Sequence, residues 1–154
     1  MKKRLLVIVF ALCSLSMFGQ NTFEEIYCKF ANEKGANCVN IGSFVMNLGK
    51  ICMDEKDAEF LKDVDNICVV DVSDCCEDTK NDFRKMANGI QNSGVELIMD
   101  VTEDQDHVKI FVKKENDMIK QFIVYSMGED TCLINIGGNI KMDDVQKLVK
   151  YSMR

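Results

Sequence analysis

The chain has 154 residues, of which 47% are hydrophobic and 29% charged, and this ordinary globular mixture excludes a wholly disordered protein. The absence of proline and the presence of only 9 glycines exclude collagen-like and proline-rich classes. The 19 basic and 25 acidic residues give a net charge of −6, which does not suit a non-specific nucleic-acid binder. This length provides one domain with a buried core.

Residues 1–19 have the order of parts found in a secretory signal peptide. Positive side chains occupy positions 2–4, and an apolar stretch of about 14 residues follows, shorter than the roughly 20 that span a bilayer. Gly19 is the small residue that signal peptidase requires before the cut. We therefore expect cleavage between Gly19 and Gln20, giving a periplasmic or secreted protein without an integral membrane segment.

Two alternatives to a cleaved signal remain open. The apolar stretch is retained as a membrane anchor, or the chain is a lipoprotein that carries lipid on Cys13. Leu12 argues against lipidation because the lipidation motif has a small residue before its cysteine. Cleavage after Gly19 leaves 16 basic against 25 acidic residues, a charge of −9, which disfavours anionic membranes and nucleic acid as partners.

Residues 22–154 contain no linker or low-complexity segment and are expected to form one domain. Thr22 is placed to cap a helix whose apolar residues Phe23, Ile26 and Phe30 recur with the helical period. The expected elements of the first half are a helix ended by Gly35, a strand over 36–41, a helical stretch from Ser43, a helix over 54–64, a strand over 66–73, and a helix that is capped by Asp74 or Asp78 and stops at Gly94.

The second half predicts strands over 95–101, 107–113, 118–127 and 131–136, then a helix over 142–152. Short polar turns between alternating strands are typical of an antiparallel meander. The strands over 66–73 and 95–101, with the helix between them, predict a βαβ-like unit. We therefore expect an α+β domain whose mixed sheet has helices on one face. Its expected core residues are Phe23, Phe30, Val70, Phe83, Ile90, Ile110, Phe122 and Ile134.

Cleavage leaves an odd number of cysteines, which are Cys28, Cys38, Cys52, Cys68, Cys75, Cys76 and Cys132. The adjacent Cys75 and Cys76 are the thiol candidates, either for a redox or soft-metal site or as two unrelated side chains, since neighbours rarely reach disulfide geometry with each other. Cys28, Cys38 or Cys52 could join them by folding. The acidic neighbours of Cys75 and Cys76 are expected to raise thiol pKa values, so we predict no catalytic redox pair.

Other candidate chemistry has simple structural explanations. His107 lies near Asp104 and Asp106, but no motif places a nucleophile beside it. Four carboxylates follow the strand over 66–73 and also suit helix capping; these are Asp71, Asp74, Glu77 and Asp78. The pair Gly137-Gly138 fits a strand-to-helix turn. The sequence thus predicts no catalytic, cofactor or metal site.

A longer pattern carries a family resemblance. It comprises the opening FEEIYCKF helix, the VNIG strand before a helix, the meander with its KKEND turn, and the INIGGNI close before a helix. Over residues 22–150 the chain resembles the domain of unknown function 4252 family, small exported proteins of Gram-negative bacteria. Lys141 stands where such sequences carry a capping residue. The resemblance implies no established activity.

These observations predict an exported, non-enzymatic envelope interaction or accessory domain that uses no cofactor. Its partner would be an unidentified envelope protein, bound at the exposed face of the meander. The alternative is a thiol redox or soft-metal-binding protein that uses Cys75 and Cys76.

Overall fold

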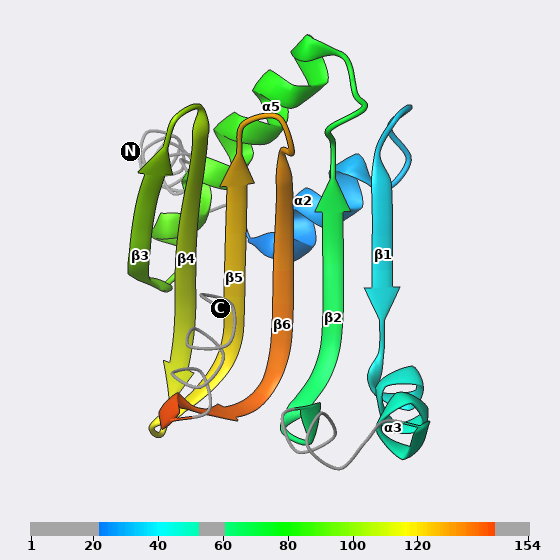
Figure 1. Ribbon diagram of the computed structural model, residues 1–154, viewed down its shortest axis with the longest axis vertical. Helices are drawn as coiled ribbons and strands as arrows, with labels where there is room; N and C mark the ends of the chain where they lie inside the picture. Colours follow the sequence, from blue (N-terminus) through cyan, green and yellow to red (C-terminus); the bar gives the residue numbers. More distant parts are fainter. Residues whose placement is uncertain (1–21, 53–60, 144–154) are drawn as a thin grey trace, which may run out of the picture.

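The computed structural model describes residues 22–52 and 61–143 and has one six-stranded sheet (Figure 1). The spatial order of the strands is β1-β2-β6-β5-β4-β3, and every neighbouring pair is antiparallel. The strands are β1 (Asn37–Ile41), β2 (Val64–Asp71), β3 (Glu96–Glu103), β4 (Asp106–Glu115), β5 (Met118–Met127) and β6 (Cys132–Lys141). The helices are α2 (Phe23–Phe30), α3 (Ser43–Cys52), α5 (Glu77–Asn88) and the 3₁₀ helix η2 (Gly89–Asn92).

The predicted α+β class and the meander of β3, β4, β5 and β6 are confirmed. The sheet is antiparallel rather than mixed. Strands β2 and β3 run in the same direction, as a βαβ unit requires, but β6, β5 and β4 lie between them. The reason is that β6 returns to pair with β2, so α5 carries the chain across the sheet to its far edge (Figure 1).

Local chemistry explains where α2 begins and ends. The Thr22 hydroxyl accepts a hydrogen bond from the Glu25 amide at 3.3 Å, and the Glu25 carboxylate accepts one from the Thr22 amide at 2.9 Å, which confirms the predicted cap. The helix ends at Phe30, earlier than predicted, and Gly35 lies in the following turn with φ +91°. A β-carbon on Gly35 would lie 2.6 Å from the Asp74 carbonyl oxygen, so this glycine lets the turn pack closely on the loop after β2.

Two further boundaries differ from those predicted. Helix α5 starts at Glu77, and its N-cap is Cys76 rather than the predicted Asp74 or Asp78. The pair Gly137-Gly138 lies inside β6 and not in a turn. A β-carbon on Gly138 would collide with the Asp63 carbonyl oxygen, so a glycine is needed where β6 passes the start of β2.

Two predicted helices lie wholly or partly outside the described residues. Of the helix over 54–64, only the end falls within them, with Leu61 helical and Val64 already in β2. Of the helix over 142–152, Met142 and Asp143 are described and are helical. No helix in the described part of the chain is long and apolar enough to cross a bilayer.

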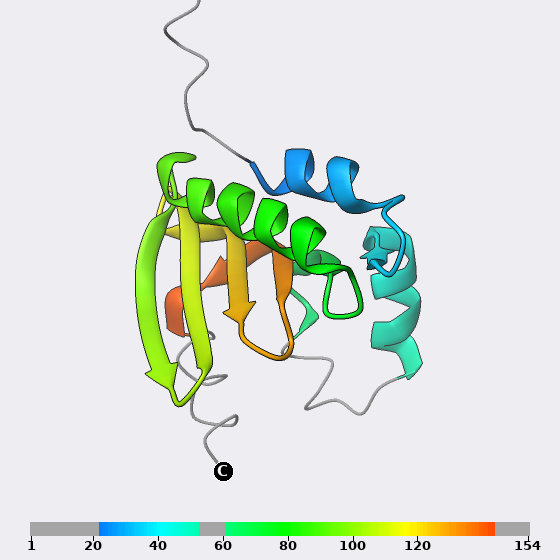
Figure 2. The same ribbon diagram turned by 90° about the horizontal axis from the view of Figure 1, so that it is seen from above.

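The hydrophobic core has two parts, one on each face of the sheet. Helices α2 and α5 lie over one face, which we call the helix-covered face (Figure 2). There the rings of Phe30, Phe83 and Tyr125 meet edge to face, with centroids 5.2 Å and 6.2 Å apart. The other face, which we call the opposite face, carries a second cluster that includes Met46 of α3, Phe122 and Ile140. The prediction that the helices lie on one face is therefore wrong for α3.

Most of the predicted core residues are buried. Those confirmed as buried are Phe23, Phe30, Val70, Phe83, Ile90 and Phe122. Ile110 and Ile134 are only half-buried, and both lie on the opposite face of the sheet.

Candidate functional site

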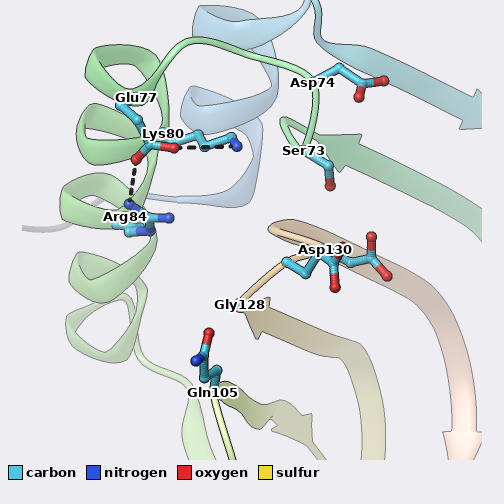
Figure 3. A pocket seen from close by; sticks show the side chains of 9 residues that line it. Ser73, Asp74, Glu77, Lys80, Arg84, Gln105, Gly128 and Asp130 are labelled. Carbon is cyan, nitrogen blue, oxygen red and sulfur yellow. Dashed lines mark ion pairs between the residues drawn. The ribbon is translucent and has the colours of Figure 1, made fainter.

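A polar cleft of about 690 Å³ lies between α5 and the loops at one end of the sheet (Figure 3). Its walls come from the loop after β2, the exposed side of α5, and the turns that follow β3 and β5. The lining side chains include Asp74, Glu77, Lys80, Arg84 and Asp130, and the full set adds Ser73, Gln105, Gly128 and Glu129.

The α5 wall is organised around one carboxylate. Glu77 pairs with the Lys80 Nζ atom at 3.4 Å and with the Arg84 Nη1 atom at 3.7 Å (Figure 3). Arg84 also donates a hydrogen bond to the Asn81 side-chain oxygen at 3.0 Å. The spacing of Glu77, Lys80 and Arg84 places all three on one side of the helix. The two cations of this wall thus already share an acidic partner.

The facing wall is held by hydrogen bonds among its loops. Asp71 accepts hydrogen bonds from the Ser73 amide at 2.8 Å and from the Ser73 hydroxyl at 2.6 Å. The Val72 amide donates to the Thr131 carbonyl at 3.0 Å, and the Thr131 hydroxyl donates to the Gly128 carbonyl at 3.1 Å. These bonds fix the loop after β2 against the turn between β5 and β6.

The cleft can make polar contacts, but its side chains do not form a nucleophile and base pair. Ser73 is the one hydroxyl among its described lining residues, and its proton goes to Asp71, with no histidine between them. Within residues 22–52 and 61–143, no three histidine, cysteine or acidic side chains gather closely enough to hold a metal ion. We therefore read the cleft as a solvated charged surface.

Beneath the cleft, Tyr125 is fully buried and its hydroxyl has no hydrogen-bond partner among the described residues. Burial raises the pKa of Tyr125 to about 12, and the positive charge of Arg84 opposes that rise. Arg84, which lines the cleft, therefore interacts electrostatically with Tyr125 of the aromatic cluster.

The two thiol candidates have opposite environments. Cys75 is buried, and burial followed by negative charge on Cys76 raises the pKa of its thiol. Cys76 is exposed at the N-cap of α5, and its sulfur lies 3.2 Å from the Thr79 hydroxyl oxygen. The side-chain and backbone hydrogen bonds of Thr79 lower the pKa of Cys76, while desolvation and then the charge of Asp78 oppose them. The predicted rise in the pKa of Cys76 is thus wrong: the charge of Asp78 acts in the predicted direction, but the hydrogen bonds of Thr79 outweigh it.

The remaining described cysteines lie apart from Cys76. Cys68 is buried, as its strand position predicts, whereas Cys38 and Cys132 are half-buried and Cys28 is exposed. Burial is the main cause that raises the pKa of Cys38, and the charge on Cys75 raises it further, so these two thiols are near each other under α2 and α5. The side chain of Cys52 lies outside the described residues.

His107 is not among the residues that line the cleft and lies at the start of β4. Its Nε2 atom contacts the Asp100 carboxylate on β3 rather than Asp104 or Asp106. A solvent-facing ion pair of this kind contributes little and has no nucleophile at hand.

Sequence reasoning found only part of the cleft. Of the four predicted carboxylates, Asp74 and Glu77 line it, Asp71 supports it through Ser73, and Asp78 is outside it. The missed lining residues are Ser73, Lys80, Arg84, Gln105, Gly128, Glu129 and Asp130. The spacing of Lys80 and Arg84 from Glu77 indicates that the three side chains share one side of a helix. No local sequence pattern indicates that the β5–β6 turn faces α5.

A second feature with functional promise is apolar. Strand β3 is exposed along nearly its whole length, and Leu97, Ile98 and Val101 are 46%, 40% and 46% exposed. In the described part of the chain β3 pairs only with β4, so its outer backbone edge is open.

The comparisons agree with the resemblance noted from sequence. No curated protein and no solved structure matches the chain. A family model does match, over residues 29–148, which is most of the domain. The chain therefore belongs to the family described as domain of unknown function DUF4252.

Proposed function

We propose that this chain is an exported, non-enzymatic interaction domain of the bacterial envelope, and that its partner binds along β3. Export rests on the order of charged, apolar and small residues before Gln20. The non-enzymatic assignment rests on the cleft, whose cations pair with Glu77 and whose hydroxyl pairs with Asp71.

The observation that carries the proposed interface is the exposure of three large apolar side chains on an outer strand. An open, apolar strand edge is a template for adding another strand, and proteins usually protect such edges. Strand β3 has partial protection, because its register shifts at Ile98 and its exposed surface carries Glu96 and Asp100. The partner that suits this edge is an extended segment with alternating apolar side chains.

The charged side chains on and beside β3 favour one orientation of an added strand. Glu96 forms an ion pair with Lys114 at 3.0 Å, and Asp100 contacts His107, so both are held on the β4 side. Glu103 and Asp104 follow at the end of the strand. An approaching strand with basic residues near this end would meet favourable charge.

The test is photo-crosslinking in cells with a photoreactive residue in place of Ile98, followed by mass spectrometry. The matched control has the same residue in place of Val39, which is 48% exposed on the other outer strand, β1. We expect an envelope protein to be captured from position 98 and not from position 39. Recovery of the monomer alone from both positions, with substrate turnover by the pure protein, would refute the proposal.

Export is tested separately by N-terminal sequencing of the protein from an envelope fraction. We expect a new N-terminus at or beside Gln20. An intact Met1 or a lipid on Cys13 would contradict a soluble exported domain.

A thiol function is the second candidate, and the environment of Cys76 is the observation that favours it. The hydrogen bond from Thr79 lowers the pKa of an exposed thiol, as a reactive cysteine requires. Buried Cys75 lacks this property, so Cys76 would act alone and not in a pair with its neighbour. Alkylation rates against pH, with Thr79→Val as the variant and Cys28 as the exposed reference thiol, measure this directly. A Cys76 rate that does not depend on Thr79 would remove the thiol candidate.

A further inference from the structure

The cysteines of the described residues are divided between the surface and the two faces of the sheet. Cys132 lies on the opposite face, because the next residue of β6 faces α2 and α5. Cys28 and Cys76 are exposed. The remaining three pack in or against the core cluster of the helix-covered face; these are Cys38, Cys68 and Cys75.

The pairing of β1 with β2 holds Cys38 on the helix-covered face. Cys38 lies opposite Val70, which is fully buried in the cluster there, and residues directly opposite each other point to the same face. No residue of β1 is fully buried, and among the described strands β1 pairs only with β2. Side-chain burial therefore contributes little to holding this outer strand on the sheet.

The loop after β2 turns back toward the start of β1. The Cys75 amide donates a hydrogen bond to the Val72 carbonyl at 3.0 Å, and Cys75 is 6% exposed within the helix-covered cluster. A β-carbon on Gly35 would lie 3.3 Å from the Cys75 α-carbon, so the turn before β1 packs on this cysteine. Cys38 follows Gly35 by three residues, and both segments lie at the same end of the sheet (Figure 1).

The electrostatics of the two thiols agree with this placement. Burial raises the pKa of Cys38, and negative charge on Cys75 raises it further. Burial is also the main cause that raises the pKa of Cys75. Ionised thiols are thus disfavoured at both positions, whereas an uncharged disulfide suits them.

Cys68 is the other buried candidate, but the strand register places it away from Cys38. It lies opposite Asn40, two residues along β1 from Cys38, and accepts a hydrogen bond from Asn66 at 3.7 Å. Diagonal neighbours in an antiparallel pair lie about 7–8 Å apart. A disulfide requires β-carbons about 3.5–4.5 Å apart. Cys75 is therefore the better-placed partner.

We propose that Cys38 and Cys75 form a disulfide that ties β1 to the loop after β2. This inference takes from the proposed function only the export to an oxidising envelope, where disulfides persist. Two S–H bonds break and one S–S bond forms. The two electrons and two protons pass to the disulfide of an envelope thiol oxidase, which is reduced to two thiols. The exchange takes place during folding, because the folded chain buries Cys75, and it leaves Cys76 as an exposed free thiol.

Refolding tests the pairing without reference to export. The purified full chain is reduced in urea, refolded in a buffer of reduced and oxidised glutathione, alkylated and digested with trypsin. We expect mass spectrometry to find peptide 35–50 joined to peptide 63–80, with Cys28 alkylated. Recovery of both peptides with only alkylated thiols would overturn the proposal.

Single variants identify the partner, since peptide 63–80 contains Cys68, Cys75 and Cys76. Cys75→Ala should abolish the joined peptides, whereas Cys68→Ala and Cys76→Ala should retain them. Circular dichroism checks that each variant folds, and fragmentation of the wild-type joined peptides gives the same assignment without a variant. A bond from Cys38 to Cys68 or Cys76 would refute the proposal.

The bond should also have a local effect on β1. We expect amides of β1 to exchange hydrogen at least about tenfold more slowly in the oxidised protein than after reduction, because the cross-link opposes local opening. Cys38→Ala should exchange at the same rate with and without reductant. Equal exchange by oxidised and reduced wild type would contradict a bond that ties β1 to the sheet.

The thiol state in cells separates this inference from export. Protein from an envelope fraction is alkylated in acid before digestion, and we expect the same joined peptides. Free thiols at positions 38 and 75 of the envelope protein would refute the disulfide. If the chain is found only in the cytoplasm but forms the joined peptides on refolding, export fails and the assigned pairing stands.

Discussion

The face of the sheet that α2 and α5 cover has more polar side chains than the opposite face, which is the reverse of what hydrophobic patterning predicts. The helix-covered face holds the larger core cluster although its rows include Asn40, Asn135, Lys109 and Asp100, of which Asn135 alone is buried. The opposite face is more uniformly apolar, yet several of its side chains remain half-exposed beside the described elements. The more apolar face is therefore not the face that α2 and α5 cover. The polar side chains of the helix-covered face lie at its periphery, or they need hydrogen-bond partners under α2 and α5.

Asn135 illustrates the cost of that arrangement. Its side chain is 4% exposed between Cys68 and Ile123, and its amide oxygen has no hydrogen-bond partner among the described residues. An unpaired buried polar atom costs free energy of about 1–3 kcal/mol. The helix-covered face is thus stabilised by its aromatic and aliphatic contacts in spite of its polar positions.

The largest expected effect is on the aromatic cluster of the helix-covered face. Phe83 is fully buried between Phe30 and Tyr125, so Phe83→Ala should lower the free energy of unfolding by about 3–5 kcal/mol. Urea unfolding followed by circular dichroism measures the change. A variant as stable as wild type would mean that α5 does not anchor this face.

The second prediction compares the faces directly through residues of one strand. Leu133 is fully buried on the helix-covered face, and Leu133→Ala should cost about 2–5 kcal/mol. Ile136 is half-buried on the opposite face, so Ile136→Ala should cost less, because its side chain has fewer contacts to lose. Urea unfolding of wild type and both variants measures the two changes. Equal losses of stability would contradict a difference in burial between the two faces.

A smaller effect is expected at the start of α2. Thr22→Ala removes the hydroxyl that accepts the Glu25 amide and should lower the free energy of unfolding by about 1 kcal/mol. Thr22→Ser keeps the acceptor and is the matched control, expected to unfold near wild type. If both variants were equally destabilised, the capping hydrogen bond would not be the cause.

The meander could be predicted from sequence because its signals are local. Its turns use Asp104, Asn116 and Asp117 at φ values of 53°, 50° and 64°, which asparagine and aspartate adopt more readily than other residues. The strands between them alternate as a two-faced sheet should. Hairpin pairing then follows from short connections alone.

The position of β6 beside β2 could not be predicted in the same way. Its register joins Ile67 to Ile136 across nearly half the chain, and no local turn encodes that contact. The cleft has the same character: Glu77, Lys80 and Arg84 are readable from helical spacing, but the approach of Asp130 depends on the β2–β6 pairing. The lowered pKa of Cys76 could not be predicted from neighbouring charge, because the hydrogen bonds of Thr79 outweigh the charge of Asp78.

The smallest effect at neutral pH is expected at the side-chain hydroxyl of Tyr125, in the aromatic cluster. This effect is also the most specific one. Because the Tyr125 hydroxyl is buried without a hydrogen-bond partner among the described residues, Tyr125→Phe removes a polar group that gains nothing there. We expect the free energy of unfolding at pH 7 to be unchanged or slightly higher.

The alkaline pH range distinguishes this from a neutral substitution. The tyrosine ionises near pH 10 in the unfolded chain and near 12 in the folded one, so the unfolded state loses its proton first. Wild-type stability should therefore fall as the pH rises from 10 toward 12, and Tyr125→Phe should fall less. Tyr27→Phe, on the half-buried tyrosine of α2, serves as the control. Parallel stability curves for wild type and Tyr125→Phe would show that the hydroxyl is hydrated, and would weaken the view of the helix-covered face as a dry aromatic core.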